Sequence, residues 1–325
     1  MSEVLVAAAQ YAPVHLDKKA TLEKLVSIVE EAAGEGVQLV VFPEAFVPAY
    51  PDWVWRTRPW SEHALSSYSR LLDNAVTDDD IAFLGGVARD HAMHLAVGVD
   101  ELAGSTIYNT LLLLGPDGSL LNRHRKLMPT GGERLVWGYG DGSTLNVLDT
   151  PIGRLGGLIC WENYMPLGRA SLYAQDVQLY VAPTWDTSDV WVPTLQHIAK
   201  EGRTYVIGCC QAIHARDLPD DVPGKAELYG DEWLARGLST IVAPGGKILA
   251  GPLVEKEGLV TATVDVARCA DSRGQFDPTG HYSRPDVFRL VVDRSVKQPV
   301  VSAGDPGGSA APPPPSPGSP AATEG

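Results

Sequence analysis

The stretch from Arg154 to Asn163 reads RLGGLICWEN and contains one cysteine between apolar and polar residues. Apolar residues up to Cys160 predict a buried strand, and the run from Leu167 to Gln175 predicts a helix. The Cys160 thiol would then lie at a strand-to-helix turn, where α/β proteins usually place their chemistry. A helix N-terminus just beyond it would favour the thiolate over the thiol. Because a lone cysteine on an apolar strand is more often an inert core residue, catalysis depends on its partners.

Strand and helix patterns alternate on both sides of this stretch. Apolar runs at 4–9 and 37–42 predict two strands, and the helix between them begins at Asp17. Helices are also predicted at 61–74 and 191–201. Further strand-like runs occur at 81–87, 94–99, 107–114, 177–181, 205–210, 238–242 and 259–264. The turn signal Gly115–Gly118 indicates a hairpin, so we expect an α/β protein with mixed sheets.

The composition argues against nucleic acid and membranes as partners and against an oxidising compartment. The chain has 325 residues, 44% of them hydrophobic and 20% charged, with a net charge of −14. Such an acidic chain argues against nucleic acid and anionic membranes as partners. The four cysteines form no CxxC pair, which argues against a disulfide framework or a zinc site. With no basic leader at the start and no apolar run of about 18 residues, we expect a cytoplasmic protein.

The chain shows one change of composition along its length. Residues 1–295 contain no linker-like break and are predicted to form one domain. Residues 296–325 form a Pro/Gly-rich tail, predicted to be disordered and dispensable for catalysis. The polar segment 212–236 is predicted to be an irregular surface insertion.

Three short motifs resemble the nitrilase superfamily of carbon–nitrogen hydrolases. They are FPEAF at 42–46, HRKLMPT at 124–130 and CWEN at 160–163. In that family a glutamate, a lysine and a cysteine follow one another in this order, each at the end of a strand. Further stretches at 133–143, 183–185 and 281–288 resemble the branch that acts on nitriles. The resemblance covers about residues 4–290.

The resemblance implies a role for each of four residues. A nitrile carbon is a weak electrophile, so the nucleophile must be a strong one, as a thiolate is. Cys160 is the expected nucleophile and Glu44 the expected general base. Lys126 is expected to stabilise the negative charge that develops in the tetrahedral species, and Glu133 to support Lys126. The expected path passes through a thioimidate and an acyl thioester to a carboxylic acid and ammonia, with no metal or organic cofactor.

The resemblance also implies a fold and an assembly. The family fold is a four-layer α-β-β-α sandwich, in which two subunits normally pair. The helix after Cys160 would lie in that interface. Nitrile-acting relatives often extend dimers into spirals, and the segment 212–236 is the candidate for such a contact here.

Aromatic side chains are the expected walls of the substrate pocket. We expect Tyr50, Trp53, Trp161 and Trp185 to bind a small nitrile, with water as the second substrate. The backbone N–H of Trp161 is a plausible additional donor to the negative charge. These residues do not distinguish an aryl from an arylaliphatic or an aliphatic nitrile.

Two alternatives stay open at this point. The first is an amidase or carbamoylase of the same fold, although amide-cleaving relatives more often carry a tyrosine where Trp161 follows Cys160. The second is a catalytically inactive binding scaffold. A metal hydrolase is disfavoured because the pair His91 and His94 lacks a third ligand.

Overall fold

The computed structural model describes residues 3–297. Residues up to Ser295 belong to one compact unit. The predicted tail lies outside the described residues apart from 296 and 297, so its disorder stays a prediction. No helix in the described range is long and apolar enough to cross a membrane.

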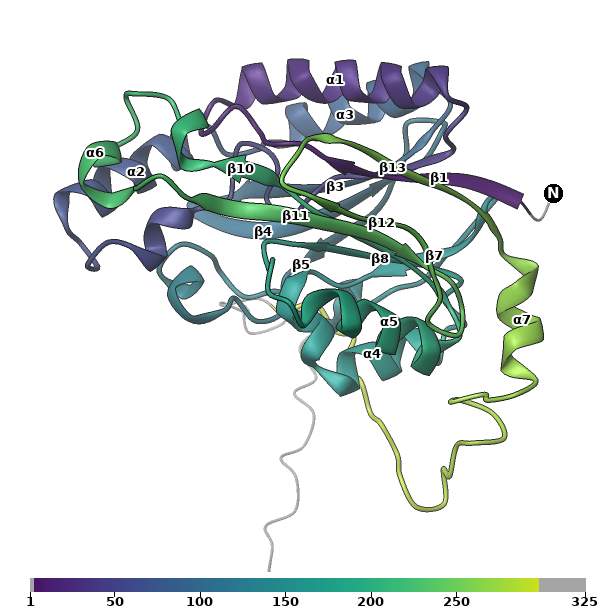
Figure 1. Cartoon of the computed structure of the whole chain (residues 1–325). Coiled ribbons are helices and arrows are strands. Elements are labelled where there is room, and N and C mark those ends of the chain that lie inside the picture. Colours follow the sequence, from purple (N-terminus) through teal and green to yellow (C-terminus); the bar gives the residue numbers. More distant parts are fainter. Residues whose placement is uncertain (1–2, 298–325) are drawn as a thin grey trace, which may run out of the picture. The chain divides into compact units, whose positions relative to one another are not determined.

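Two mixed sheets lie face to face between two pairs of helices (Figure 1). The first sheet has the order β13 (Gly258–Asp265), β1 (Glu3–Gln10), β2 (Leu39–Val41), β3 (His94–Ala103), β4 (Thr106–Leu114), β5 (Leu120–Arg125). The second has the order β10 (Ala212–His214), β11 (Trp233–Val242), β9 (Tyr205–Cys210), β8 (Leu179–Thr184), β7 (Gly153–Gly157), β6 (Leu148–Thr150), with β12 (Ile248–Val254) paired to β11. In each sheet the central strands are parallel and the outer ones antiparallel.

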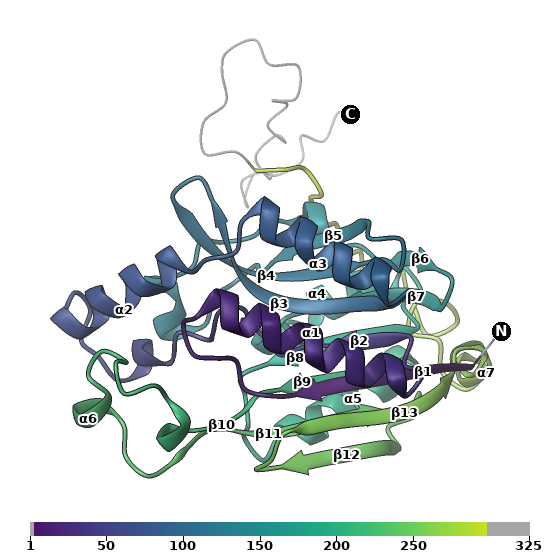
Figure 2. The same cartoon turned by 90° about the horizontal axis from the view of Figure 1, so that it is seen from above.

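The helices form the outer layers. Helices α1 (Lys18–Gly34) and α3 (Asp78–Asp90) cover the first sheet and lie over β1 to β3 in Figure 2. Helices α4 (Pro166–Tyr173) and α5 (Trp191–Gly202) cover the second sheet. The remaining helices are α2 (Glu62–Asp73), α6 (Lys225–Leu228) and α7 (Ala267–Arg273). The predicted four-layer sandwich is therefore confirmed.

Strand β1 shows how the sequence produces these layers. Its residues alternate between the two faces, so Val6 packs against the second sheet while Ala7 packs against the helices. Both faces are covered, which explains why the strand reads as a continuous apolar run. On the other side of the sheet interface, Leu155, Val181 and Ile207 fill the same core.

The strand predicted at 81–87 is wrong, because these residues belong to helix α3. The side chain of Asp80 accepts from the Thr77 N–H in a capping box, and Asp78 to Asp80 form an acidic first turn. The buried residues Ile81, Leu84 and Val87 then follow helical spacing. The cap and the helical spacing of the buried residues therefore decide the structure of a run that was predicted as a strand.

The segment 212–236 is also more regular than predicted. Strand β10 pairs with the start of β11, and Ile213, Val222 and Ala235 are buried in one small core. The segment is anchored by ion pairs from Arg56 to Glu232 and from Arg70 to Asp221. It is therefore a packed extension of the second sheet rather than an irregular insertion.

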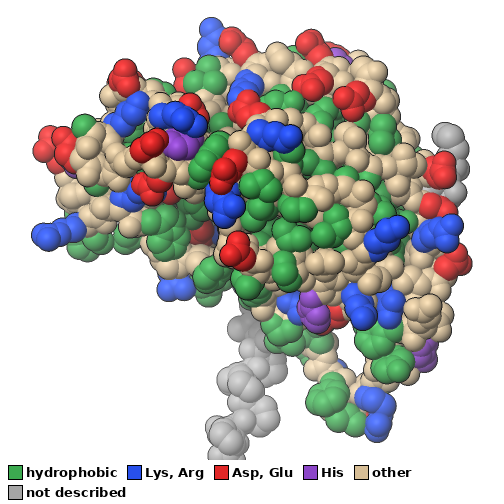
Figure 3. Space-filling model, viewed as in Figure 1, with side chains coloured by type: hydrophobic (Ala, Val, Ile, Leu, Met, Phe, Trp, Pro, Cys, Tyr) green, Lys and Arg blue, Asp and Glu red, His purple; other side chains and the backbone are tan. Residues whose placement is uncertain are grey.

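The surface shown in Figure 3 carries acidic and basic side chains interspersed with one another. Hydrophobic side chains gather over β11 and β12, where Leu249 and Val254 are each 39% exposed. The negative net charge of the chain is thus not concentrated in one region of this face.

Candidate active site

Three strand ends bring the predicted catalytic residues together. Glu44 follows β2 and Lys126 follows β5, both in the first sheet, whereas Cys160 follows β7 in the second. The backbone N–H of Lys126 donates to the carbonyl of Asn109 on β4, which continues the sheet hydrogen bonding to this residue. The site therefore lies where the ends of the two sheets meet.

The Lys126 ammonium lies between two carboxylates. Its Nζ donates to Glu44 Oε1 and to Glu133 Oε2, each at 2.7 Å, and the side chain is fully buried. Burial disfavours the ammonium, but Glu44, the Cys160 sulfur and Glu133 outweigh that effect and raise the pKa of Lys126. Lys126 therefore carries a firmly held positive charge beside the nucleophile.

Glu44 has the features of a general base. Burial raises the pKa of its carboxyl, Glu133 raises it further, and Lys126 opposes the rise. Oε1 accepts from Lys126 and from Asn109 Nδ2 at 2.7 Å, while the buried Oε2 has no hydrogen-bond partner. The neighbouring Cys160 side chain, like Lys126, opposes the rise in the Glu44 pKa. A carboxylate with one free oxygen and a raised pKa is a suitable acceptor for the proton of the neighbouring thiol.

Cys160 lies in a strained turn at the start of a short 3₁₀ helix, Cys160–Tyr164. Its φ is 49°, and Thr184 Oγ1 donates to its Sγ at 3.2 Å. Burial, with Glu44 next to it, raises the pKa of the thiol well above its ordinary value, although Lys126 opposes this. The expectation of a thiolate favoured by the following helix is therefore wrong for the resting site. Cys160 needs a base to deprotonate it.

Glu133 is fixed by three hydrogen-bond donors around it. Besides Lys126, its carboxylate accepts from the Tyr50 hydroxyl at 2.7 Å and from the Thr130 N–H at 2.6 Å. The Thr130 bond belongs to a capping box that starts a 3₁₀ helix, Gly131–Leu135. Glu133 is thus an orienting group for Lys126 with no free oxygen facing Cys160.

Sequence reasoning missed Glu162, which ties the two sheets together. Its buried carboxylate accepts from the N–H of Leu127 and of Ile159, each at 2.7 Å, and contacts His124 Nε2 at 3.1 Å. Burial raises the pKa of this carboxyl, but His124 and the two N–H groups outweigh burial and lower it. Glu162 therefore fixes the residue after Lys126 to the residue before Cys160. Its place in the CWEN motif was the available signal.

Amide side chains complete the support and were also missed. Asn163 Nδ2 donates to the carbonyl of Cys160 at 2.8 Å, and its Oδ1 accepts from the Tyr180 hydroxyl at 2.7 Å. Gln211 Nε2 donates to the carbonyl of Glu44 at 3.0 Å. These bonds hold the backbone of the nucleophile and of the base from the core side.

A cavity of about 400 Å³ opens above Cys160. Three of the predicted aromatic walls line it, together with Trp55: Tyr50, Trp161 and Trp185. Tyr50 and Trp185 are stacked with ring centroids 4.3 Å apart, and Trp161 Nε1 donates to Asp186 at 2.8 Å. The cavity is large enough for a small ligand, and its floor carries the reactive groups.

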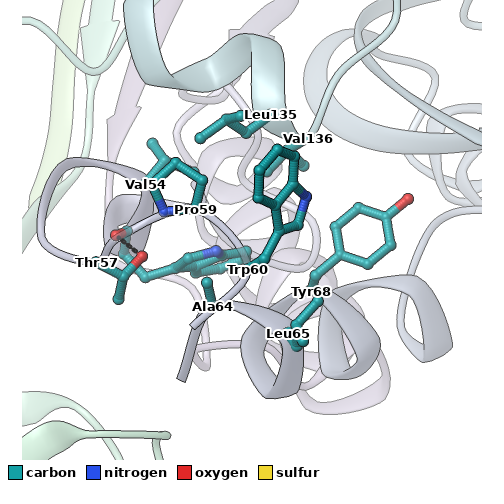
Figure 4. A pocket seen from close by; sticks show the side chains of 10 residues that line it. Val54, Thr57, Pro59, Trp60, Ala64, Leu65, Tyr68, Leu135 and Val136 are labelled. Atoms are coloured by element: carbon teal, nitrogen blue, oxygen red, sulfur yellow. Dashed lines mark hydrogen bonds between the residues drawn. The ribbon is translucent and has the colours of Figure 1, made fainter. Parts of the chain in front are cut away.

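The structure does not bring Trp53 to this cavity. Trp53 is 3% exposed and lines a separate apolar pocket of about 220 Å³. Figure 4 shows Trp60 and Tyr68 on one side of that pocket and Leu135 on the other. Trp55, two residues further along the same 3₁₀ turn Asp52–Trp55, takes the place predicted for Trp53 and donates to the Tyr50 hydroxyl.

Cysteines, histidines and carboxylates elsewhere in the described residues are the other candidates for nucleophiles or metal ligands. All four cysteines are free and buried. No group of three or more His, Cys, Asp or Glu side chains between residues 3 and 297 could hold a metal ion. His91 and His94 therefore gain no third ligand.

The carbon-nitrogen hydrolase family model matches residues 5–273 of this chain. The chain belongs to the carbon-nitrogen hydrolase family. It is 42% identical over 308 residues to an aliphatic nitrilase of Sinorhizobium fredii (strain HH103), covering 93% of this chain and 99% of the relative. It is 41% identical over 303 residues to a bifunctional nitrilase/nitrile hydratase of Lupinus angustifolius, covering 90% of this chain and 86% of the relative.

A solved structure supports the fold. The crystal structure of Saccharomyces cerevisiae Nit3, a member of branch 10 of the nitrilase superfamily, matches with a TM-score of 0.69. The match covers 86% of this chain and 97% of that protein at 23% identity. At this identity the match concerns the arrangement of layers and strands.

Proposed function

We propose that this protein is a nitrilase, which hydrolyses a small nitrile to a carboxylic acid and ammonia. The observation that carries the proposal is one cluster of reactive groups beside a cavity. Cys160 and Glu133 line the cavity, and the buried Lys126 behind them donates to both Glu133 and Glu44. Relatives named as nitrilases, similar over nearly the full chain, support the nitrile as substrate. The exposed Trp161 at the cavity wall, where an amidase or carbamoylase more often has tyrosine, also favours the nitrile.

The first half of the reaction forms a thioimidate. Glu44 takes the proton of Cys160, and the sulfur attacks the nitrile carbon as the thiolate forms. Negative charge develops on the nitrile nitrogen, which the Lys126 ammonium stabilises. The nitrogen then takes the proton that Glu44 received from Cys160, which gives the neutral thioimidate and restores the Glu44 carboxylate. Coupling deprotonation to attack overcomes the raised pKa of the buried thiol.

The second half releases ammonia and then the acid. Glu44 activates a water molecule that adds to the thioimidate carbon, giving a tetrahedral species with nitrogen and sulfur on one carbon. Protonated nitrogen leaves as ammonia, and a second water hydrolyses the acyl thioester. The two carboxylates of Glu44 and Glu133 outnumber the single ammonium of Lys126, which favours a protonated nitrogen in the tetrahedral species. Ammonia should therefore leave more often than the Cys160 sulfur, and the acid should exceed the amide that forms when sulfur leaves first.

A homo-oligomer and a reducing compartment belong to the same proposal. Large apolar side chains are exposed on and around helix α4, including Met165, Leu167 at 66% and Val190 at 61%. We propose that this face pairs two subunits, and that the extension 212–236 joins dimers into a larger assembly or spiral. The four free, buried cysteines support a cytoplasmic location.

The test replaces the nucleophile and compares the other cysteines. Cys160→Ala should abolish ammonia release from a panel of aryl, arylaliphatic and aliphatic nitriles, with an unchanged circular dichroism spectrum. Cys269→Ala is the control, because Cys269 is a buried free cysteine outside the cavity, and this variant should remain active. Mass spectrometry of the wild-type product should show mainly acid. Turnover by Cys160→Ala would overturn the mechanism, and amide as the main product would make the protein a hydratase.

A further inference from the structure

Asp100 is a buried carboxyl group that the proposed reaction does not use. It lies on β3 and is fully buried, and among residues 3–297 its only side-chain hydrogen-bond partner is Trp137 rather than a lysine or arginine. Its Oδ1 accepts from Trp137 Nε1 at 2.6 Å, while Oδ2 is buried without a hydrogen-bond partner. An ionised carboxylate in such a place would be costly, so the state of this group needs an explanation.

The residue opposite Asp100 carries a second unpartnered oxygen. Asp100 pairs with Asn109 in the antiparallel register of β3 and β4. Asn109 donates through Nδ2 to Glu44 Oε1, and its buried Oδ1 has no hydrogen-bond partner. Side chains opposite each other on antiparallel strands lie on the same face of the sheet. Two acceptor oxygens therefore remain without a donor on one face of one strand pair.

The backbone brings these two side chains as close as a strand pair allows. The N–H of Asp100 donates to Val47 and its carbonyl accepts from Val76, so both groups point away from β4. The carbonyl of Asn109 accepts from Lys126 on the opposite side. Asp100 and Asn109 thus form a non-hydrogen-bonded pair, the kind in which opposing side chains approach most closely.

We propose that Asp100 is a neutral carboxylic acid, whose Oδ2 proton bonds to Asn109 Oδ1 and thereby positions the general base Glu44. A single proton satisfies both unpartnered oxygens. It also fixes the orientation of the Asn109 amide, because Oδ1 receives the proton and Nδ2 must face Glu44. The relay runs from Asp100 through Asn109 to Glu44 Oε1 and leaves Glu44 Oε2 free for the thiol.

Electrostatics support the neutral state. Burial raises the pKa of Asp100 well above its ordinary value, Glu44 and Glu133 raise it further, and only the Trp137 bond opposes this. Neighbouring Glu101 shows the contrast, because Arg125 donates to both of its oxygens and Arg123 to one. The two buried carboxyl groups therefore have different surroundings. Glu101 is paired with guanidinium groups, whereas Asp100 has no cationic partner among the described residues and stays a neutral carboxylic acid.

The proton can be detected without substrate. In the infrared spectrum of the full chain at neutral pH, the difference between wild type and Asp100→Asn should contain the carbonyl band of a neutral carboxylic acid. The matched control Glu101→Gln should remove only carboxylate bands. A difference spectrum of Asp100→Asn that shows a lost carboxylate instead would overturn the proposal. This arm stands whether or not the protein acts on nitriles.

The positioning role rests on the proposed function and is tested by kinetics. Asp100→Asn keeps a donor toward Asn109 and an acceptor for Trp137, so kcat/KM should stay within about threefold, with the same acidic limb of the pH profile. Asp100→Ala should lower kcat/KM about tenfold or more. In an Asn109→Ala background, Asp100→Ala should have little further effect. Equal effects of Asp100→Ala in both backgrounds would overturn the relay through Asn109.

Discussion

At Lys126 one fully buried ammonium group donates to two carboxylates. Lys126→Arg keeps the charge but adds a planar fork that cannot place one nitrogen 2.7 Å from both Glu44 and Glu133. We expect kcat/KM for ammonia release to fall by about 100-fold or more, the cost of losing one oriented donor. Activity within a few-fold of wild type would show that a positive charge alone suffices.

Glu162 gives the site a dependence on acid pH. Its pKa is lowered in the folded protein, so its contribution to stability is complete above the unfolded value of 4.5 and is lost as pH falls through the folded pKa. Glu162→Gln leaves one buried N–H without an acceptor and should cost about 3 kcal/mol at neutral pH. Urea unfolding of both proteins should show a constant difference above pH 4.5 and a shrinking one as the pH falls further. A difference independent of pH would argue against an ionised Glu162.

The family resemblance of short motifs predicted Glu44, Lys126, Glu133 and Cys160 as site residues, and the structure brings these four side chains together. Among their supporting residues, Glu162 and Asn163 lie in the CWEN motif, whereas Asp100, Asn109 and Gln211 lie outside the motifs and could not be found in this way. Asp100 and Asn109 act through a strand register, which depends on pairing between residues distant from both motifs. The raised pKa of the Cys160 thiol follows from burial, which a strand pattern does not quantify. The sequence therefore indicates which groups react, but not the hydrogen bonds and the burial that position them and set their pKa values.

Helix α3 shows the same limit at the scale of an element. Its two adjacent glycines, Gly85 and Gly86, have different surroundings in the fold. A Cβ on Gly85 would lie 2.5 Å from the carbonyl oxygen of Gly118 in the β4–β5 turn, whereas one on Gly86 would meet only the Arg89 side chain at 3.8 Å. Gly85 thus permits a close contact between helix and hairpin that a local pattern cannot show.

This contrast gives a matched pair of variants. Gly85→Ala should lower the free energy of unfolding by about 1–3 kcal/mol, because the helix or the turn must move. Gly86→Ala should raise it by up to about 1 kcal/mol, since alanine favours the helix and nothing obstructs it. Thermal unfolding of the two variants against wild type would measure both signs. Equal effects of the two substitutions would contradict the close contact at Gly85.

At the scale of the whole molecule, the exposed apolar face around helix α4 makes the proposed pairing testable. Leu167→Lys places a charge on a side chain that is 66% exposed, so the isolated subunit should tolerate it. If this face pairs two subunits, sedimentation velocity should show a smaller species than wild type. Leu249→Lys, on β12 and 39% exposed, is the control and should leave the assembly unchanged. The same species for Leu167→Lys and wild type would place the interface elsewhere.

The junction made by Glu162 has a consequence for how the enzyme fails. Glu44 and Lys126 are attached to the first sheet and Cys160 to the second. A shift of one sheet relative to the other would therefore separate these groups while every strand stays intact. A displacement of about 1 Å costs about 100-fold in rate. In rising urea, ammonia release should therefore vanish before the far-ultraviolet circular dichroism changes, and coincident transitions would contradict this. The rate of ammonia release then reports the relative position of the two packed sheets, and it is more sensitive to that position than a measurement of secondary structure.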